Sequence, residues 1–117
     1  MTELTKLTSI SEQLADRVVA LAPERIPAEV RTRCEDLLIE LAGLCVAARN
    51  TGYMRALVAA VDGGGPCSAI GHALEFSAED AAMINGTAAH GEDFDDTFEG
   101  GPVHAGAVIV PAVLAAC

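Results

Sequence analysis

The sequence predicts an all-α fold on three observations. Apolar residues make up 51% of the 117 residues and aromatic residues only 3%, so the core must be aliphatic and rich in alanine. Alanine, leucine, glutamate and arginine are strong helix formers. Apolar residues also recur at helical spacing, and two serines stand at capping-box positions that mark helix starts. A chain of this length is one domain at most, residues 1–117, and it can bury a core without disulfides.

Charge and cysteine usage exclude several classes of function. The formal net charge is −10, and all seven Lys and Arg residues lie at or before Arg55. Binding to nucleic acid needs clustered Lys and Arg, so no nucleic-acid partner is expected. No apolar run reaches the ~18–20 residues of a membrane span, and the N-terminus lacks a signal-peptide pattern. The four cysteines show no metal-binding spacing and are interpreted as buried thiols of a cytoplasmic protein. They are Cys34, Cys45, Cys67 and Cys117.

The first half of the chain predicts three helices. A capping box at Ser9–Glu12 and apolar residues at helical spacing predict a helix from about Ser11 to Leu21. Pro27 suits the first turn of a second helix, which is apolar on most sides from Leu37 to Ala48 and is therefore expected to be deeply buried. A short third helix is predicted over Tyr53–Val61.

The second half begins with a glycine-rich connector and ends in an apolar helix. Residues Asp62–Gly71 lack the glycines and lysine of the phosphate-binding motifs, so they predict a connector with room for a short extended piece at Ser68–Ile70. A capping box at Ser77 predicts a helix over Ala78 to about His90, whose small residues allow another helix to approach closely. The final segment, residues 105–117, is apolar throughout. We therefore expect the chain to be a fragment, with the rest of the protein or a second chain packing on residues 105–117.

The stretch "AAHGEDFDDTF", residues 88–98, places four carboxylates close together. If the helix continued to about Asp96, Asp93 would follow the small-residue stripe inward, with His90 close enough to pair with it. Glu92 and Asp96 would share the neighbouring stripe with Asn85. At least one carboxylate should then point inward, and its pKa should depend strongly on its partner.

His104 follows a Gly-Gly-Pro loop and is predicted to stand at the start of the last helix. A helix N-terminus attracts anions and disfavours the imidazolium form, so a neutral histidine there suits acid–base chemistry. The alternative is a solvated acidic surface beside a structural histidine. A further alternative is a Mg²⁺-dependent prenyl-diphosphate enzyme that uses Asp95, Asp96 and Glu99 of "DDTFE". A third is a non-catalytic helical module that binds a partner through residues 105–117.

Several linked segments resemble the MmgE/PrpD family. They are "NGTAAH", "DFDDT" and a histidine that leads into the helix "HAGAVIVPAVLAA". The resemblance implies the N-terminal part of a large helical-bundle domain, which in the complete protein is followed by further helices and a smaller lid domain. It implies a homodimer that acts on small polycarboxylates such as 2-methylcitrate, cis-aconitate or iminodisuccinate. The chemistry implied is dehydration, decarboxylation or epimerisation by acid–base residues, without a metal or cofactor.

The resemblance also assigns residues by position. Asp93, Thr97 and His104 match pocket residues of the family: His104 as proton donor or acceptor, Thr97 as hydroxyl donor to a carboxylate, and Asp93 to orient or polarise a neighbour. His90, Asp96 and Asn85 are expected to bind substrate or to hold those residues in place. The sequence departs from the pattern at Gly91-Glu92 and at Ala105, which leaves the substrate open. The family's pocket lysines lie later in the chain and are absent here.

Overall fold

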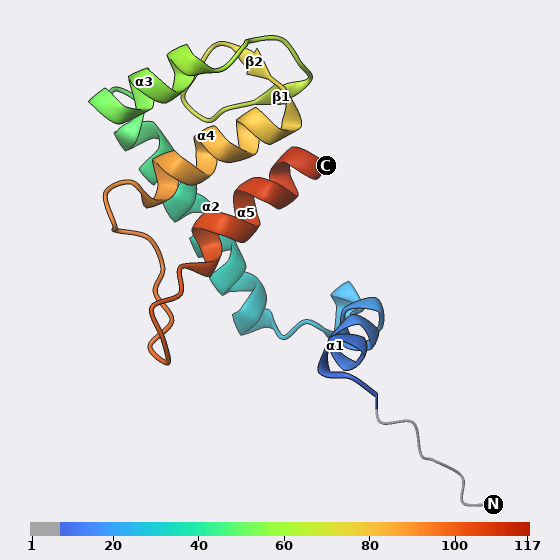
Figure 1. Cartoon of the computed structure of the whole chain (residues 1–117). Coiled ribbons are helices and arrows are strands. Elements are labelled where there is room, and N and C mark those ends of the chain that lie inside the picture. Colours follow the sequence, from blue (N-terminus) through green and yellow to red (C-terminus); the bar gives the residue numbers. More distant parts are fainter. Residues whose placement is uncertain (1–7) are drawn as a thin grey trace, which may run out of the picture. The chain divides into compact units, whose positions relative to one another are not determined.

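The computed structural model describes residues 8–117, which are mostly helical with one small sheet, as the sequence predicted (Figure 1). The chain divides into two compact units, one that ends at Arg33 and one from Cys34 to Cys117, and each is considered by itself. Among the described residues, every helix is too short or too polar to cross a membrane.

The N-terminal unit contains helix α1, Ile10–Val19, and begins as predicted with a capping box. The hydroxyl oxygen of Ser9 accepts a hydrogen bond from the Glu12 amide at 3.1 Å, and the Ser9 amide donates to the Glu12 carboxylate at 2.8 Å. These bonds to Ser9 lower the pKa of Glu12. The helix ends two residues before the predicted Leu21, and a short 3₁₀ helix, Pro23–Arg25, follows it.

The second unit is organised around helix α4, Ala78–His90, which ends where the sequence predicted. Helix α2, Ala28–Ala48, crosses the boundary between the units, and its later turns enter this core. Helix α3, Gly52–Ala60, begins beside the C-terminal end of α4, where Tyr53 lies against Gly91. Strands β1, Cys67–Ser68, and β2, Glu75–Phe76, lie toward the N-terminal end of α4, which β2 directly precedes. Helix α5, Ala105–Ala116, runs alongside α4 (Figure 1). The core that these elements bury is aliphatic, with Phe76, Met54 and Ile84 as its largest fully buried side chains.

The close approach of α5 to α4 depends on Gly86, as the small-residue stripe predicted. A Cβ atom at Gly86 would lie 3.1 Å from the carbonyl oxygen of Ala107 and 3.9 Å from Cγ of Pro111. Pro111 lies inside α5 and has no N–H, so this carbonyl lacks its usual helical partner. The carbonyl of Ala107, which Pro111 leaves without a helical hydrogen bond, is therefore the group of α5 that lies against Gly86 of α4.

Helix α2 is less buried than its apolar sequence predicted. Leu41, Cys45 and Ala48 are buried, but Ile39 is 72% exposed, and Leu38 and Val46 are also exposed. The prediction of a deeply buried helix was wrong for these described residues, because only one face of α2 has a packing partner. The prediction that all four thiols are buried is correct only for Cys45. Burial raises the pKa of the Cys45 thiol to about 11. Cys67 is half-buried, and Cys34 and Cys117 are exposed.

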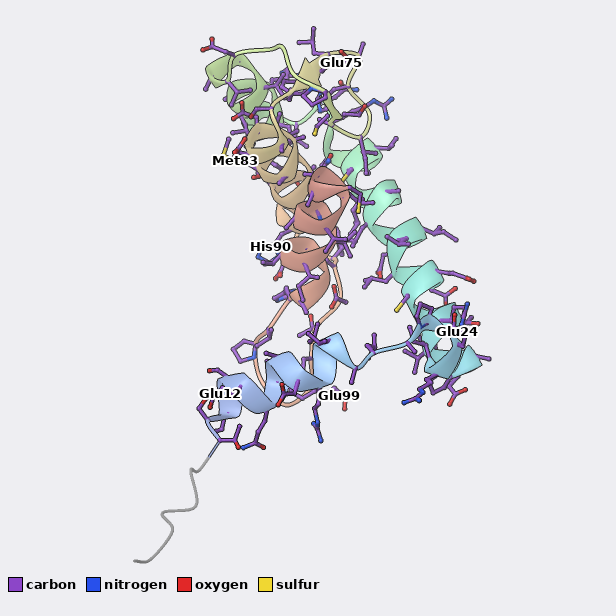
Figure 2. All side chains as sticks on the ribbon, turned by 90° about the vertical axis from the view of Figure 1, so that its right-hand side faces the viewer. Glu12, Glu24, Glu75, Met83, His90 and Glu99 are labelled. Carbon is purple, nitrogen blue, oxygen red and sulfur yellow. The ribbon has the colours of Figure 1, made fainter. Side chains whose placement is uncertain are left out.

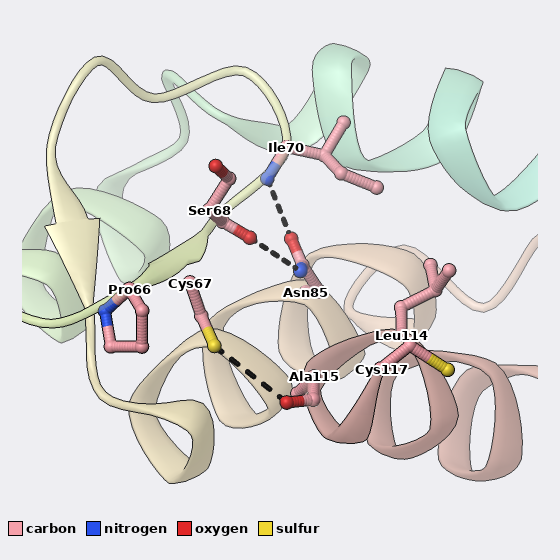
Figure 3. Close-up of a pocket in the computed structure, with 8 residues that line it drawn as sticks. All are labelled: Pro66, Cys67, Ser68, Ile70, Asn85, Leu114, Ala115 and Cys117. Atoms are coloured by element: carbon pink, nitrogen blue, oxygen red, sulfur yellow. Dashed lines mark hydrogen bonds between the residues drawn. The ribbon is translucent and has the colours of Figure 1, made fainter.

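Asn85 ties the glycine-rich connector to α4. Its side-chain oxygen accepts a hydrogen bond from the Ile70 amide at 2.7 Å, and its side-chain nitrogen donates to the Ser68 carbonyl at 3.3 Å (Figure 3). The extended piece predicted at Ser68–Ile70 is thus held at both ends, although the strand itself is Cys67–Ser68, antiparallel to β2. Asn85 is 5% exposed. It also lines an open pocket of about 320 Å³ between the connector and the end of α5.

We expect Asn85→Ala to destabilise the fold by about 1–3 kcal/mol, because two backbone groups of the connector lose their partner. The free energy of unfolding in urea, followed by circular dichroism, measures the loss. Asn50→Ala is the matched control, since Asn50 is an exposed residue in a turn. A loss for Asn85→Ala no larger than that of the control would contradict this structural role.

Candidate active site

The acidic stretch is a loop rather than a continued helix. Helix α4 ends at His90, and residues 91–104 form a loop that a bridge between Phe98 and Val103 closes. Asp93 adopts a left-handed backbone with φ of 58°, so it cannot extend the helix. The predicted stripe that carried Asp93 inward was therefore wrong, and so was the stripe shared by Glu92, Asp96 and Asn85.

Two features mark the end of the helix at His90. The C-terminal end of a helix carries partial negative charge, so four further carboxylates in the next turns would be repelled there. Gly91 also lies against the ring of Tyr53, and a side chain at this position would collide with that ring. Gly91 therefore lets Tyr53 pack against the end of α4, at the point where the chain turns away.

Asp95 is the carboxylate that points inward. Its side chain has no solvent-exposed surface, whereas the side chain of Asp93 is 78% exposed. Nδ1 of His90 lies 3.0 Å from Oδ1 and 3.2 Å from Oδ2 of Asp95. The sequence correctly predicted one inward carboxylate with a histidine partner but chose the wrong aspartate. No pattern marked Asp95, because its apolar neighbour Phe94 is 74% exposed while Asp95 itself is buried.

His104 stands at the N-cap of α5, as predicted, and its ring lies between two carboxylates. Nδ1 is 3.4 Å from Oδ2 of the buried Asp95, and Nε2 is 3.7 Å from Oδ1 of the exposed Asp93. The His104 and His90 rings lie 4.7 Å apart, centre to centre. His90 projects from the last turn of α4, on the same side as Met83 (Figure 2). The loop thus brings two imidazoles and two carboxylates together, and these are the described residues that could hold a metal ion.

The start of α5 already has an anion, Asp96. The Gly106 amide, in the first turn of α5, donates to the Asp96 carboxylate at 3.0 Å from Oδ1 and 3.3 Å from Oδ2. A Cβ atom at Gly106 would collide with this carboxylate, so the glycine permits the contact. Asp96 therefore acts as the missing side-chain cap of α5 and helps to hold His104 at the beginning of the helix.

The remaining predicted residues are placed as follows. Thr97 is exposed in the loop, and its hydroxyl lies 3.5 Å from the Asp95 carbonyl, at the limit of a hydrogen bond. Asn85 is held by the connector and does not join the cluster of histidines. The "DDTFE" segment gives no support to a diphosphate site, because Asp95 is buried against His90 while Asp96 caps α5.

The site is negatively charged. In the part of the chain that the structure describes, Asp93 and Asp95 form ion-pair contacts with the two histidines and none with Lys or Arg. The carboxylate of Asp95 raises the pKa of His90 above the ordinary 6.5, first by hydrogen bonding and then by its charge, and Asp93 adds a smaller electrostatic contribution. His90 therefore keeps its positive charge to a higher pH than a free histidine.

We expect Asp95→Asn to lower the pKa of His90 toward 6.5, because the charged acceptor is lost. An NMR titration of the His90 imidazole measures it, and Asp93→Asn is the control that should lower the pKa less. The pairing stabilises the folded state fully below about pH 6.5, the pKa of an unpaired histidine. This contribution is lost as the pH rises through the raised pKa that His90 has in the folded state. An unchanged pKa in Asp95→Asn would contradict the pairing.

Comparison with known proteins agrees with the motifs. The model of the MmgE/PrpD N-terminal domain matches residues 12–117. The cis-aconitate decarboxylase-like protein oryM of Aspergillus oryzae is 28% identical over 119 residues, which cover 99% of this chain and 25% of that protein. The chain thus spans about a quarter of the length of this curated relative. No solved structure matched. Because the family model covers nearly the whole chain, the resemblance seen in the motifs is confirmed: the chain belongs to the MmgE/PrpD family.

Proposed function

We propose that the full-length protein is an enzyme that acts on a small di- or tricarboxylate by acid–base chemistry next to a carboxylate group. The observation that carries this proposal is the position of His104, between a buried and an exposed aspartate at the start of α5. Family membership supports an enzyme of this type. The name of the relative, a cis-aconitate decarboxylase-like protein, supports a substrate of the same class as 2-methylcitrate, cis-aconitate or iminodisuccinate.

In this proposal Nε2 of His104 takes a proton from, or gives a proton to, the substrate carbon next to a carboxylate group. Nδ1 of His104 faces Oδ2 of Asp95 at 3.4 Å without forming a hydrogen bond in the structure. A small rotation of the ring would let Nδ1–H donate to this carboxylate, which would leave Nε2 as the basic atom. Asp93 lies beside Nε2 and would orient the ring or polarise its proton. The left-handed backbone of Asp93 supports a functional role, since strained non-glycine residues concentrate at working sites.

Thr97 and His90 would bind the anionic substrate. The exposed hydroxyl of Thr97 is a hydrogen-bond donor for a substrate carboxylate. The side chain of His90 is about half exposed, and the pairing with Asp95 favours its cationic form. Asp96 and Asn85 would act indirectly, because their side chains are occupied by backbone groups of α5 and of the connector.

An acidic wall cannot hold a polycarboxylate alone, because like charges repel. We propose that the cationic side of the pocket comes from residues outside these 117 or from a second subunit of a homodimer. Those additional residues or that second subunit would also cover the outer face of α5, where four apolar side chains are exposed: Val108, Ile109, Val113 and Leu114. A carbanion next to a carboxylate can form by removal of a proton, which leads to elimination or epimerisation, or by loss of CO2, after which the acid–base group supplies a proton to the carbon. We therefore assign either a lyase or an isomerase, acting without a metal in the cytoplasm.

We expect His104→Ala in the full-length enzyme to lower kcat by on the order of 10²-fold or more, because the proton-transfer group is lost. Turnover of 2-methylcitrate, cis-aconitate and iminodisuccinate is measured in turn. His72→Ala is the control, since His72 follows the connector and lies outside the cluster. A kcat within a few-fold of the parent would remove His104 from this role. A stable complex with a partner but no turnover of any substrate would favour the interaction module instead.

A further inference from the structure

One potential ligand atom from each of His90, Asp93, Asp95 and His104 lies within 4.8 Å of the others. Nitrogen and oxygen ligands bind a zinc-like ion at about 2.0–2.2 Å, which places neighbouring ligands about 3.0–3.6 Å apart. The contacts between these residues run through both nitrogens of His104 and both oxygens of Asp95. Nδ1 of His90 lies 3.0 Å from Oδ1 of Asp95, Nδ1 of His104 lies 3.4 Å from Oδ2 of Asp95, and Nε2 of His104 lies 3.7 Å from Oδ1 of Asp93. One ion can use only one nitrogen of His104, and the 4.8 Å limit is about 1–2 Å wider than the spacing around a zinc-like ion, so the four side chains would move closer together when an ion binds.

The cluster contains no Lys or Arg, and one of its ring nitrogens has no hydrogen-bond partner. Asp95 is buried, and neither it nor Asp93 has a Lys or Arg partner among residues 8–117. Nδ1 of His104 is buried without a hydrogen bond, although it faces Oδ2 of Asp95. A divalent cation bound between the side chains would supply positive charge to balance the two aspartates. It would also give the ring nitrogen of His104 a partner.

The donor set selects the class of ion. Two imidazoles with two carboxylates suit divalent transition metals, whereas Mg²⁺ and Ca²⁺ prefer oxygen ligands throughout. We propose that His90, Asp93, Asp95 and His104 form a binding site for one divalent transition-metal ion such as Zn²⁺ or Co²⁺. The ligands come from the last residue of α4, the loop and the N-cap of α5, so the ion would join both ends of the loop.

The ion would inhibit the enzyme, an inference that rests on the proposed function. An ion bound to Nδ1 of His104 leaves the proton of the neutral ring on Nε2, so the atom that would accept the substrate proton has no free lone pair. The ion would therefore compete with catalysis rather than take part in it. Free transition metal in the cell would then regulate the same pocket that binds the substrate.

The test uses the full-length protein after treatment with EDTA. Isothermal titration with Zn²⁺ and the visible absorption of Co²⁺ should both show one ion per chain. We expect His90→Gln and Asp93→Asn each to weaken the Kd by on the order of 10-fold or more, since each removes one of four ligands. His72→Gln is the matched control for a histidine outside the cluster. A double Cys34→Ser, Cys117→Ser variant controls for the two exposed thiols.

The outcomes separate this inference from the proposed function. Absence of saturable binding, or binding lost in the cysteine or His72 variants but kept in His90→Gln, would overturn the metal site. Binding with the expected variant pattern but with no inhibition of turnover would overturn the inhibitory role. A large loss of kcat in His104→Ala together with no metal binding would leave the acid–base function in place and remove the metal site alone.

Discussion

The contact on which the candidate site depends is the carboxylate of Asp95 between His90 and His104. A buried carboxylate is costly unless a cationic or hydrogen-bonding group satisfies it, and here both facing groups are imidazoles. One imidazole belongs to the last residue of α4 and the other to the N-cap of α5. The same carboxylate therefore holds the two ends of the loop together. It also keeps the two histidine rings close, with 4.7 Å between their centres.

Glycines make this arrangement possible on either side of the loop. Gly86 lets the carbonyl of Ala107 approach α4, and Gly106 leaves room for the Asp96 carboxylate at the first turn of α5. The position of His104 is thus fixed by backbone contacts rather than by a side-chain cap of its own. A histidine that is held this way can exchange protons without loosening the helix that carries it.

Local signals in the sequence predicted most of the fold. Helix α4 begins at the Ser77 cap and ends at His90, and both limits follow from neighbouring residues. The acidic loop was mispredicted because the helical period was extended beyond Gly91 without weighing the repulsion between carboxylates and a helix C-terminus. The burial of Asp95 and its contact with His104, nine residues later, depend on the three-dimensional conformation of the loop. The spacing of residues along the chain does not predict that conformation. The exposure of Ile39 likewise depends on packing partners rather than on its apolar neighbours.

The most direct test of the account is a crystal structure of the full-length protein with tricarballylate, a saturated tricarboxylate that cannot react by elimination. The account predicts a carboxylate of this ligand within hydrogen-bond distance of Nε2 of His104 and of the Thr97 hydroxyl. It also predicts that Asp95 remains buried between the two histidines. A ligand bound elsewhere, with the loop of residues 91–104 making no contact to it, would contradict the central claim that this loop forms the wall of the active site.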